Sequence, residues 1–343
     1  MADLLERLAR GPVICAEGYL FELERRGYLQ AGGFVPEVVL EHPEKVAELH
    51  REFVHAGSDV VEAFTYYAHR EKLRIIGRED VLERINRQAL EIATAVAAET
   101  GAIAAGNVCN TNVYSGEESA ARVRAMFEEQ VAWAVEAGVD FVIGETFSWA
   151  GEAVLATSVI KDAGVPAVVT LTMHRDGTTR EGLSPGEACR RIEAAGADVV
   201  GLNCTRGPDT FLPHLEEVRN AVSVHVAGLP VPYRTTEAHP TMQSLEDEHT
   251  AGLAAGGRPF PTALDPFTCS RYEIAEFTRR AVEIGVDYLG VCCGAAPHHI
   301  RSMAEALGRT PPASRYTADL SKHYALGSDA TLQEANRRFA ERL

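Results

Sequence analysis

A short pattern that recurs along the chain constrains its fold more than any other feature. Each copy has a glycine after a helical segment, an aspartate two residues later and then an apolar run. Glycine just past a helix end supplies a left-handed cap, and the apolar run is typical of a buried strand. The copies are AGSDVV at 56–61, AGVDFV at 137–142, AGADVV at 195–200 and IGVDYL at 284–289.

Apolar runs and helical periodicity together predict the fold class. The segments between the strand candidates have helical apolar faces, such as Leu82, Ile85 and Ala89. Eight strands, mostly separated by one helix, predict a (β/α)8 TIM-type barrel, with a doubly wound open sheet as the alternative. No G-x-G-x-x-G follows the first strand, which disfavours dinucleotide binding. The strand candidates are 12–17, 59–65, 102–107, 140–146, 167–173, 198–204, 225–231 and 288–293.

The pattern predicts one barrel over residues 1–310 and a C-terminal extension over 311–343. Thr331 and Glu334 have the spacing of a capping box, which predicts a terminal helix. Its apolar stripe could pack on its own barrel or on another subunit, so a homo-oligomer stays open. The long segment 234–269 is rich in glycine and proline, as functional lids and disordered loops are.

Charge and the N-terminal sequence exclude several classes of protein. The 33 basic and 49 acidic residues give a net charge of −16, which disfavours binding to nucleic acid or to an anionic membrane. No apolar run approaches the roughly 18 residues of a membrane-spanning helix. The start, MADLLERLARGPVI, has no apolar region typical of a secretory signal. These features predict a cytoplasmic protein.

Groups capable of chemistry gather at the predicted carboxyl ends of the strands, where barrels of this type place their active sites. His298 and His299 begin the last barrel helix, where we expect solvent exposure. His174 and the two asparagines after the third strand, Asn107 and Asn110, are weaker candidates. The other residues at these ends are Glu17, Gly18, Tyr66, Tyr67, Glu145, Thr146, Asn203, Cys204, Tyr233, Cys292 and Cys293.

Three of the seven cysteines form the strongest signal. Cys204 ends the sixth strand, and Cys292 and Cys293 end the eighth, so their thiols can converge. Three thiolates suit Zn²⁺, and a fourth open position is typical of a catalytic site. Adjacent cysteines face opposite sides of a strand, so both reach one metal only if the strand ends or bulges there, which Gly294 permits. Three buried structural cysteines are the alternative. The others are Cys15, Cys109, Cys189 and Cys269.

Several of these segments resemble the homocysteine S-methyltransferase family, and most closely its betaine–homocysteine methyltransferase branch. The resemblance covers roughly residues 12–308. The segments are GLNC at 201–204, GVCCGAAPHHI at 290–300, FELERRGYLQAG at 21–32, PEVVLEHPEKVAELHREFVHAGSDVVEAFTYYA at 36–68 and the GET of the fourth strand. The resemblance implies a zinc-dependent barrel that moves a methyl group to a thiol. It makes Cys204, Cys292 and Cys293 the zinc ligands and Glu145 the acid that holds the amino group of homocysteine.

The implied partners are two small molecules, a thiol and an onium methyl donor. Coordination to Zn²⁺ deprotonates a thiol, and an onium donor releases a neutral leaving group. A quaternary ammonium is held by aromatic faces through cation–π attraction. The resemblance points to Tyr67, and Phe34 stands where the branch has tryptophan; each aromatic could equally be core packing. The candidates for the donor site are Phe34, Tyr66, Tyr67, Trp149 and Tyr233, with Phe64 and Tyr19 as further walls.

Two departures from the family leave its zinc chemistry intact but affect substrate identity. The family has Asp-Gly-Gly at the end of the first strand, where this chain has Ala16, Glu17 and Gly18. Moving the acid by one position can turn it away from the site unless the strand bends. Thr146 stands where the betaine-using branch has tyrosine. We predict that Glu17, Gly18, Glu145 and Asn203 bind the thiol amino acid.

Three functions fit these residues. The first is a zinc-dependent S-methyltransferase that methylates homocysteine, giving methionine, or a related thiol from a betaine-like donor. The second is a catabolic demethylase of another quaternary ammonium or sulfonium compound with a different thiol acceptor. The third is a non-catalytic zinc barrel that binds a cationic ligand.

Overall fold

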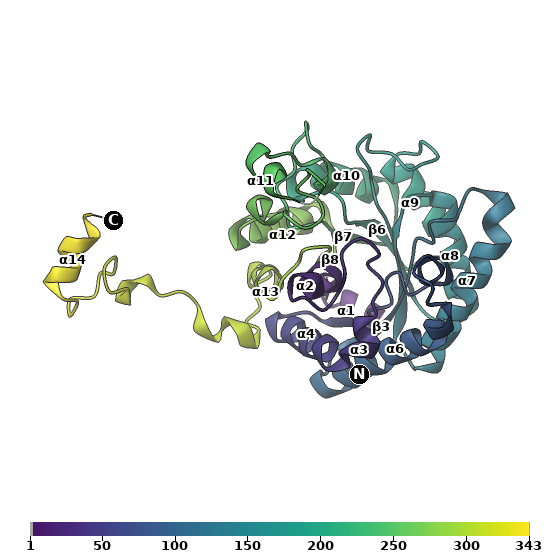
Figure 1. The fold of residues 1–343 in the computed structure, drawn as a ribbon, viewed down its shortest axis with the longest axis horizontal. Helices are drawn as coiled ribbons and strands as arrows, with labels where there is room; N and C mark the ends of the chain where they lie inside the picture. The colour runs from purple at the N-terminus through teal and green to yellow at the C-terminus, as the bar shows by residue number, and fades with distance from the viewer. Residues whose placement is uncertain (1–2, 255, 343) are drawn as a thin grey trace.

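The computed structural model describes residues 3–254 and 256–342. Its strands pair in parallel and in chain order to close a barrel, with helices around the outside (Figure 1). The prediction of a (β/α)8 barrel is confirmed, and the open sheet is excluded because β1 pairs with β8. The strands are β1 (Val13–Ala16), β2 (Val60–Glu62), β3 (Ile103–Cys109), β4 (Phe141–Phe147), β5 (Ala167–Leu171), β6 (Val199–Asn203), β7 (His225–Leu229) and β8 (Tyr288–Val291).

Most helices begin after the carboxyl end of a strand, and they cover the outer face of the barrel (Figure 1). They are α1 (Leu4–Leu8), α2 (Tyr19–Arg25), α3 (Val38–Glu41), α4 (Pro43–Ala56), α5 (Arg70–Ile75), α6 (Leu82–Thr100), α7 (Glu117–Glu136), α8 (Ala150–Asp162), α9 (Pro185–Ala194), α10 (Pro208–Ala221), α11 (Glu248–Leu253), α12 (Arg271–Ile284), α13 (Pro297–Ala306) and α14 (Glu334–Ala340). Short 3₁₀ turns are η1 (Glu79–Val81), η2 (Met242–Ser244), η3 (Asp265–Phe267), η4 (Pro312–Tyr316) and η5 (Leu320–Lys322).

The recurring sequence pattern has one structural role in all four copies. Each glycine has a positive φ, from 76° at Gly138 to 118° at Gly57, as its position after a helix requires. Each aspartate lies before an even-numbered strand and accepts a hydrogen bond from a backbone N–H of the preceding odd-numbered strand. The donor–acceptor pairs are Ile14 and Asp59 at 2.8 Å, Ala104 and Asp140 at 2.7 Å, Ala167 and Asp198 at 2.8 Å, and Val226 and Asp287 at 3.1 Å.

The core has two layers. The larger layer lies between the strands and the outer helices, and the smaller one fills the barrel interior. Leu4 and Leu8 of α1 belong to the interior layer, so this short helix covers the end of the barrel where the strands begin. Inside the barrel, alternate residues of a strand face inward, as Val13 and Cys15 of β1 do. This alternation determines which side chains reach the opposite end.

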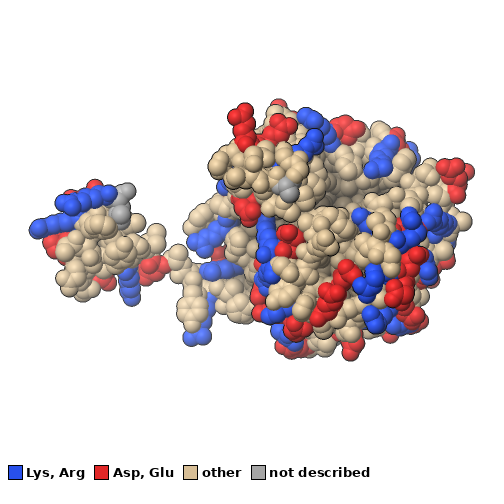
Figure 2. All heavy atoms as spheres, viewed as in Figure 1, with Lys and Arg blue, Asp and Glu red and all other residues tan. Residues whose placement is uncertain are grey.

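The outer surface is laced with ion pairs. Acidic and basic side chains are interspersed over the face shown in Figure 2. Arg51 pairs with Glu99 at 2.8 Å, which joins α4 to α6, and Arg70 pairs with Glu129 at 2.6 Å. Exposed pairs of this kind contribute little to stability individually.

The segment between β7 and α12 contains η2, α11 and η3, and it returns to the barrel through a bridge between Tyr233 and Thr268. After α13 the chain continues as a tail, and α14 lies apart from the barrel (Figure 1). The predicted capping box is wrong: α14 begins at Glu334, and the Thr331 hydroxyl instead donates to Asp329 at 2.6 Å. The apolar stripe of α14 is not buried, since Phe339 is 50% exposed. The domain boundary at residue 310 stays a prediction.

Candidate active site at the carboxyl ends of the strands

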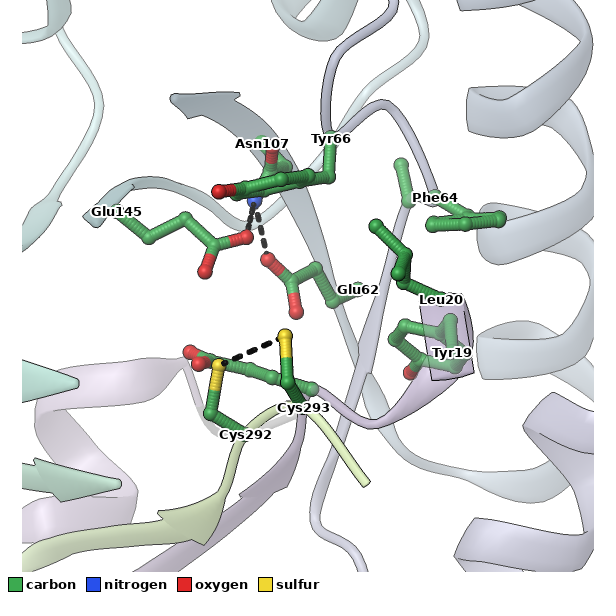
Figure 3. A pocket seen from close by; sticks show the side chains of 11 residues that line it. Tyr19, Leu20, Glu62, Phe64, Tyr66, Asn107, Glu145, Cys292 and Cys293 are labelled. Carbon is green, nitrogen blue, oxygen red and sulfur yellow. Dashed lines mark hydrogen bonds between the residues drawn. The ribbon is translucent and has the colours of Figure 1, made fainter. Parts of the chain in front are cut away.

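Inward-facing residues of four strands meet above the interior core. Glu62 on β2, Asn107 on β3, Glu145 on β4 and Asn203 on β6 all continue the inward alternation of their strands, and so does Glu17 just after β1. Glu17, Glu62, Asn107 and Glu145 line a small cavity together with the thiols of Cys292 and Cys293 (Figure 3), and Asn203 lies beside it, bonded to Glu17 and Glu145. Glu17 therefore does not turn away from the site, because Cys15 faces inward and Glu17 lies two residues later.

The three predicted metal ligands converge. Sγ atoms of Cys204, Cys292 and Cys293 all lie within 4.8 Å of one another, and those of Cys292 and Cys293 are 4.0 Å apart. Strand β8 ends at Val291, as a shared ligand role requires, and the chain then turns. Gly294 occupies the turn with a φ of 94°, which side-chain-bearing residues rarely adopt, and a Cβ there would clash with the Tyr233 hydroxyl.

The Cys204 thiol is held by strained backbone. Cys204 and Thr205 have φ angles of 62° and 53°, which cost energy in residues other than glycine. The Cys204 N–H donates to the Leu229 carbonyl at 2.9 Å, which fixes this conformation. Hydrogen bonds from the Cys292 and Cys293 thiols hold the pKa of Cys204 well below its ordinary value. The hydrogen bonds to Cys204 in turn raise the pKa values of Cys292 and Cys293 well above their ordinary value. The three converging thiols fit a soft-tolerant tetrahedral cation with one open position.

Two amides connect the carboxylates. Asn107 Nδ2 donates to Glu62 Oε1 at 2.5 Å and to Glu145 Oε1 at 2.7 Å. Asn203 Nδ2 donates to Glu145 Oε2 at 2.8 Å and to Glu17 Oε2 at 3.3 Å. Burial raises the pKa of Glu145 to about 7, and burial together with the charge of Glu145 raises the pKa values of Glu17 and Glu62 well above their usual range.

Of the predicted aromatic residues, Tyr66 lines the cavity, as do Tyr19 and Phe64 (Figure 3). Tyr67 does not line the cavity, but its ring packs on that of Tyr66, with centroids 4.3 Å apart. The Lys72 ammonium lies 3.8 Å from the centroid of the Tyr67 ring, so one face of that ring already contacts a cation. The backbone of Tyr67 is also strained, with a φ of 63°.

Among the described residues, the other predicted donor-site aromatics do not line this cavity. Phe34 packs on Phe21 with centroids 5.7 Å apart, and Trp149 packs on Tyr114 with centroids 5.8 Å apart. Tyr233 is fully buried, and its hydroxyl accepts a hydrogen bond from Arg25 Nη2 at 2.9 Å.

Gly18 allows the end of β1 to approach the metal-site turn. A Cβ on Gly18 would lie 2.5 Å from the Ala295 carbonyl oxygen, so no larger residue fits there without displacing the turn. The role of Gly18 that these contacts support is therefore close packing, and any substrate contact would come from its backbone.

Two findings go beyond the sequence reasoning. Glu62 was not predicted, although the inward alternation from Val60 would have indicated it.

The expected exposure of His298 and His299 is wrong for His299, which is 1% exposed. Its Nδ1 accepts a hydrogen bond from the Ala296 N–H at 3.1 Å, which closes the first turn of α13. The predicted candidate His174 forms a hydrogen bond between its Nε2 and the Ser148 hydroxyl at 2.8 Å, rather than with one of the three thiols.

No helix in the described part of the chain is both long and apolar enough to cross a membrane.

Known proteins resemble this chain over most of its length. A model of the homocysteine S-methyltransferase family matches residues 15–307. The S-methylmethionine–homocysteine S-methyltransferase BHMT2 of Rattus norvegicus is 36% identical over 320 residues, covering 91% of this chain and 84% of the relative. Betaine–homocysteine S-methyltransferase 1 of Bos taurus is 38% identical over 313 residues, covering 89% and 74%.

A solved structure shares the fold. The metallated form of the homocysteine methyltransferase MmuM from Escherichia coli matches with a TM-score of 0.67 and 16% identity, covering 86% of this chain and 96% of that one.

Proposed function

Because this chain belongs to the homocysteine S-methyltransferase family and is a methyltransferase, we propose that it transfers a methyl group from an onium donor to the thiol of homocysteine, giving methionine. The single observation that carries this proposal is the convergence of three thiols beside a buried carboxylate cluster at the mouth of the barrel. The relatives named above use homocysteine with S-methylmethionine or with betaine.

Cys204, Cys292 and Cys293 would hold a zinc ion. Zinc bound there would supply a Lewis acid that keeps the acceptor thiol deprotonated at neutral pH. No fourth described Cys, His, Asp or Glu belongs to this thiol group, which matches a donor set with one open position.

Glu145 would hold the ammonium group of homocysteine. Its two oxygens are already fixed by amides of Asn107 and Asn203, so the carboxylate is oriented before substrate binds. Glu17 would perform the role of the aspartate that the family has one position earlier, since Asn203 donates hydrogen bonds to both Glu17 and Glu145. Asn203 thus serves as a positioning residue for both acids.

The donor would enter from the aromatic side of the cavity. Tyr66 lines the cavity, and the ring of Tyr67 packs on it. A positively charged methyl group is attracted to such faces, and the leaving group departs as a neutral molecule that needs no proton. The residues of the site therefore align sulfur, methyl and leaving atom rather than exchange protons with the donor.

A demethylase with another thiol acceptor is the second candidate. Thr146 donates to Glu145 at 3.0 Å, so it is used within the carboxylate cluster and offers the donor no aromatic ring. Selection of a donor other than betaine would follow from that substitution.

A metal and donor survey tests the proposed function. The protein would be stripped with a chelator, reloaded with zinc, and assayed with homocysteine against betaine, S-methylmethionine and dimethylsulfoniopropionate. We expect one zinc per chain and methionine formation from at least one donor only in the reloaded protein. Full activity in the stripped protein would refute the zinc-dependent reaction, whereas zinc binding without any methyl transfer would favour a binding protein.

A further inference from the structure

We propose that Glu62 is a specificity-determining residue that completes a three-carboxylate cradle for the ammonium group of the thiol acceptor. This inference rests on the proposed function and deepens it, because it assigns a role to a residue outside the expected substrate site. The cradle consists of Glu17, Glu62 and Glu145.

The three carboxylates lie around one point. One carboxylate oxygen of Glu17 and one of Glu62 lie within 4.8 Å of each other, and the same holds for Glu17 and Glu145. The amide of Asn107 joins Glu62 to Glu145. Figure 3 shows Glu62 and Glu145 pointing toward each other below the Asn107 amide, with the thiols of Cys292 and Cys293 on the opposite side of the cavity.

The cluster has unused hydrogen-bonding capacity. Glu17 is 7% exposed, and its Oε1 has no hydrogen-bond partner. A buried carboxylate oxygen without a partner is costly, and a ligand that donates to it removes that cost. No Lys, Arg or His is among the described residues that line the cavity, so the protein itself supplies no cation there.

A primary ammonium matches this arrangement. It has three N–H donors, one for each carboxylate, and it carries the positive charge that the cluster lacks. A carboxylate of Glu17 also lies within 4.8 Å of the Cys292 thiol. A short acceptor bound through sulfur at the thiols can therefore place its amino group in the cradle. Thiols without an amino group would leave three carboxylates without a cation.

The comparison of two acceptors isolates the role of Glu62. The zinc-loaded wild type and the Glu62→Gln variant would be titrated by calorimetry with homocysteine and with 4-mercaptobutyrate, which is homocysteine without its amino group. We expect Glu62→Gln to weaken homocysteine binding roughly 10- to 100-fold, as loss of a charged hydrogen bond predicts. Binding of 4-mercaptobutyrate should change by less than about 2-fold or improve, because it has no ammonium to lose.

Glu152→Gln is the matched control. Glu152 is also a buried carboxylate, but Thr111 satisfies it outside the cavity, so neither acceptor should respond. Glu62→Asp, which retracts the charge by one methylene, should give a smaller loss for homocysteine alone and covers the case in which Glu62→Gln fails to fold.

Equal losses for both thiols, or no loss for homocysteine, would overturn the proposal. So would a second zinc per chain that disappears in Glu62→Gln, since Cys15, Glu17 and Glu62 would then be metal ligands. If the wild type binds homocysteine but methylates it from no donor, the proposed function fails while the binding comparison still decides the role of Glu62.

Discussion

The two ends of the barrel obey opposite rules. At the end where the strands begin, four aspartates accept backbone hydrogen bonds in one repeated geometry, and α1 covers the interior. At the end where the strands finish, the geometry is irregular, and Glu17 Oε1 and Asn107 Oδ1 have no hydrogen-bond partner. All described residues other than glycine with positive φ lie on this side: Phe34, Tyr67, Asn112, Thr146, Cys204 and Thr205.

The difference shows where stability and function reside. The regular end fixes strand register with ordinary hydrogen bonds, and it can be altered at a cost in folding energy alone. The irregular end holds strained backbone, a cluster of three thiols and buried carboxyl groups, which persist only because the rest of the fold enforces them. Substitutions at the two ends should therefore separate stability from activity.

The largest effect is expected from Cys292→Ala at the irregular end. It removes one of three thiols, so we expect bound zinc to be lost and methyl transfer to fall toward the uncatalysed rate, a loss on the scale of the roughly 10⁶-fold or greater acceleration of enzymes. Metal analysis and a methionine assay check this. Cys189→Ala, a buried cysteine elsewhere, should retain both. Retained activity without zinc would show that the thiols serve structure.

Tyr67→Ala tests the donor side of the same end. Loss of an aromatic face should raise the KM for the donor by up to roughly 30-fold, since a desolvated cation–π contact contributes about 2 kcal/mol. Tyr67→Phe keeps the face and should retain the KM. Steady-state kinetics with the donor varied would decide, and an unchanged KM in Tyr67→Ala would remove this residue from the donor site.

At the regular end, Asp140→Ala should reduce the free energy of unfolding by about 1–2 kcal/mol, because the Ala104 N–H loses its acceptor. The kcat should not change, since Asp140 lies at the far end of the strand from the thiols. Urea denaturation measures the first quantity, and Asp140→Asn, which keeps an acceptor, should lose less. A kcat that falls together with the free energy of unfolding would contradict the claim that the regular end affects stability alone.

The effect that is smallest at neutral pH is a loss of stability in acid. Burial lowers the pKa of His299 to about 3, so the folded protein keeps this side chain neutral while the unfolded chain takes up a proton near its ordinary pKa of 6.5. The unfolded state thus binds more protons below pH 6.5, and stability falls as pH falls, by up to about 1.4 kcal/mol per pH unit. His299→Asn should flatten the decline between pH 6.5 and 4.5 in urea denaturation, and the exposed His55→Asn should not. Parallel curves for wild type and His299→Asn would exclude this residue as the source.

Periodic features were predictable from sequence. The glycine–aspartate pattern and the apolar runs located every strand to within a few residues, because strands buried on both faces form continuous apolar runs. The convergence of Cys204 with Cys292 and Cys293 was predictable for the same reason, since parallel strands end at one rim.

Features set by long-range contact were not predictable. The inward direction of Glu17 depends on register within the closed barrel, and the burial of His299 depends on packing around α13. The contact of Lys72 with Tyr67 follows from a strained turn after β2 that no local pattern indicates. The start of α14 was missed because Asp329 competes for the Thr331 hydroxyl.

Each of the four aspartates forms a hydrogen bond between an odd-numbered strand and the even-numbered strand that follows it. The barrel therefore consists of four strand pairs, each with its own aspartate hydrogen bond. The first pair supplies Glu17 and Glu62 to the cavity, the second supplies Asn107 and Glu145, and the fourth supplies Cys292. Asn203 of the third pair donates hydrogen bonds to Glu17 and Glu145. Side chains at the carboxyl ends of one strand pair can thus be exchanged to select a new acceptor or donor. The aspartate hydrogen bond at the opposite end of that pair keeps the register of both strands. The substrate specificity of such a barrel can change one strand pair at a time while the fold is kept.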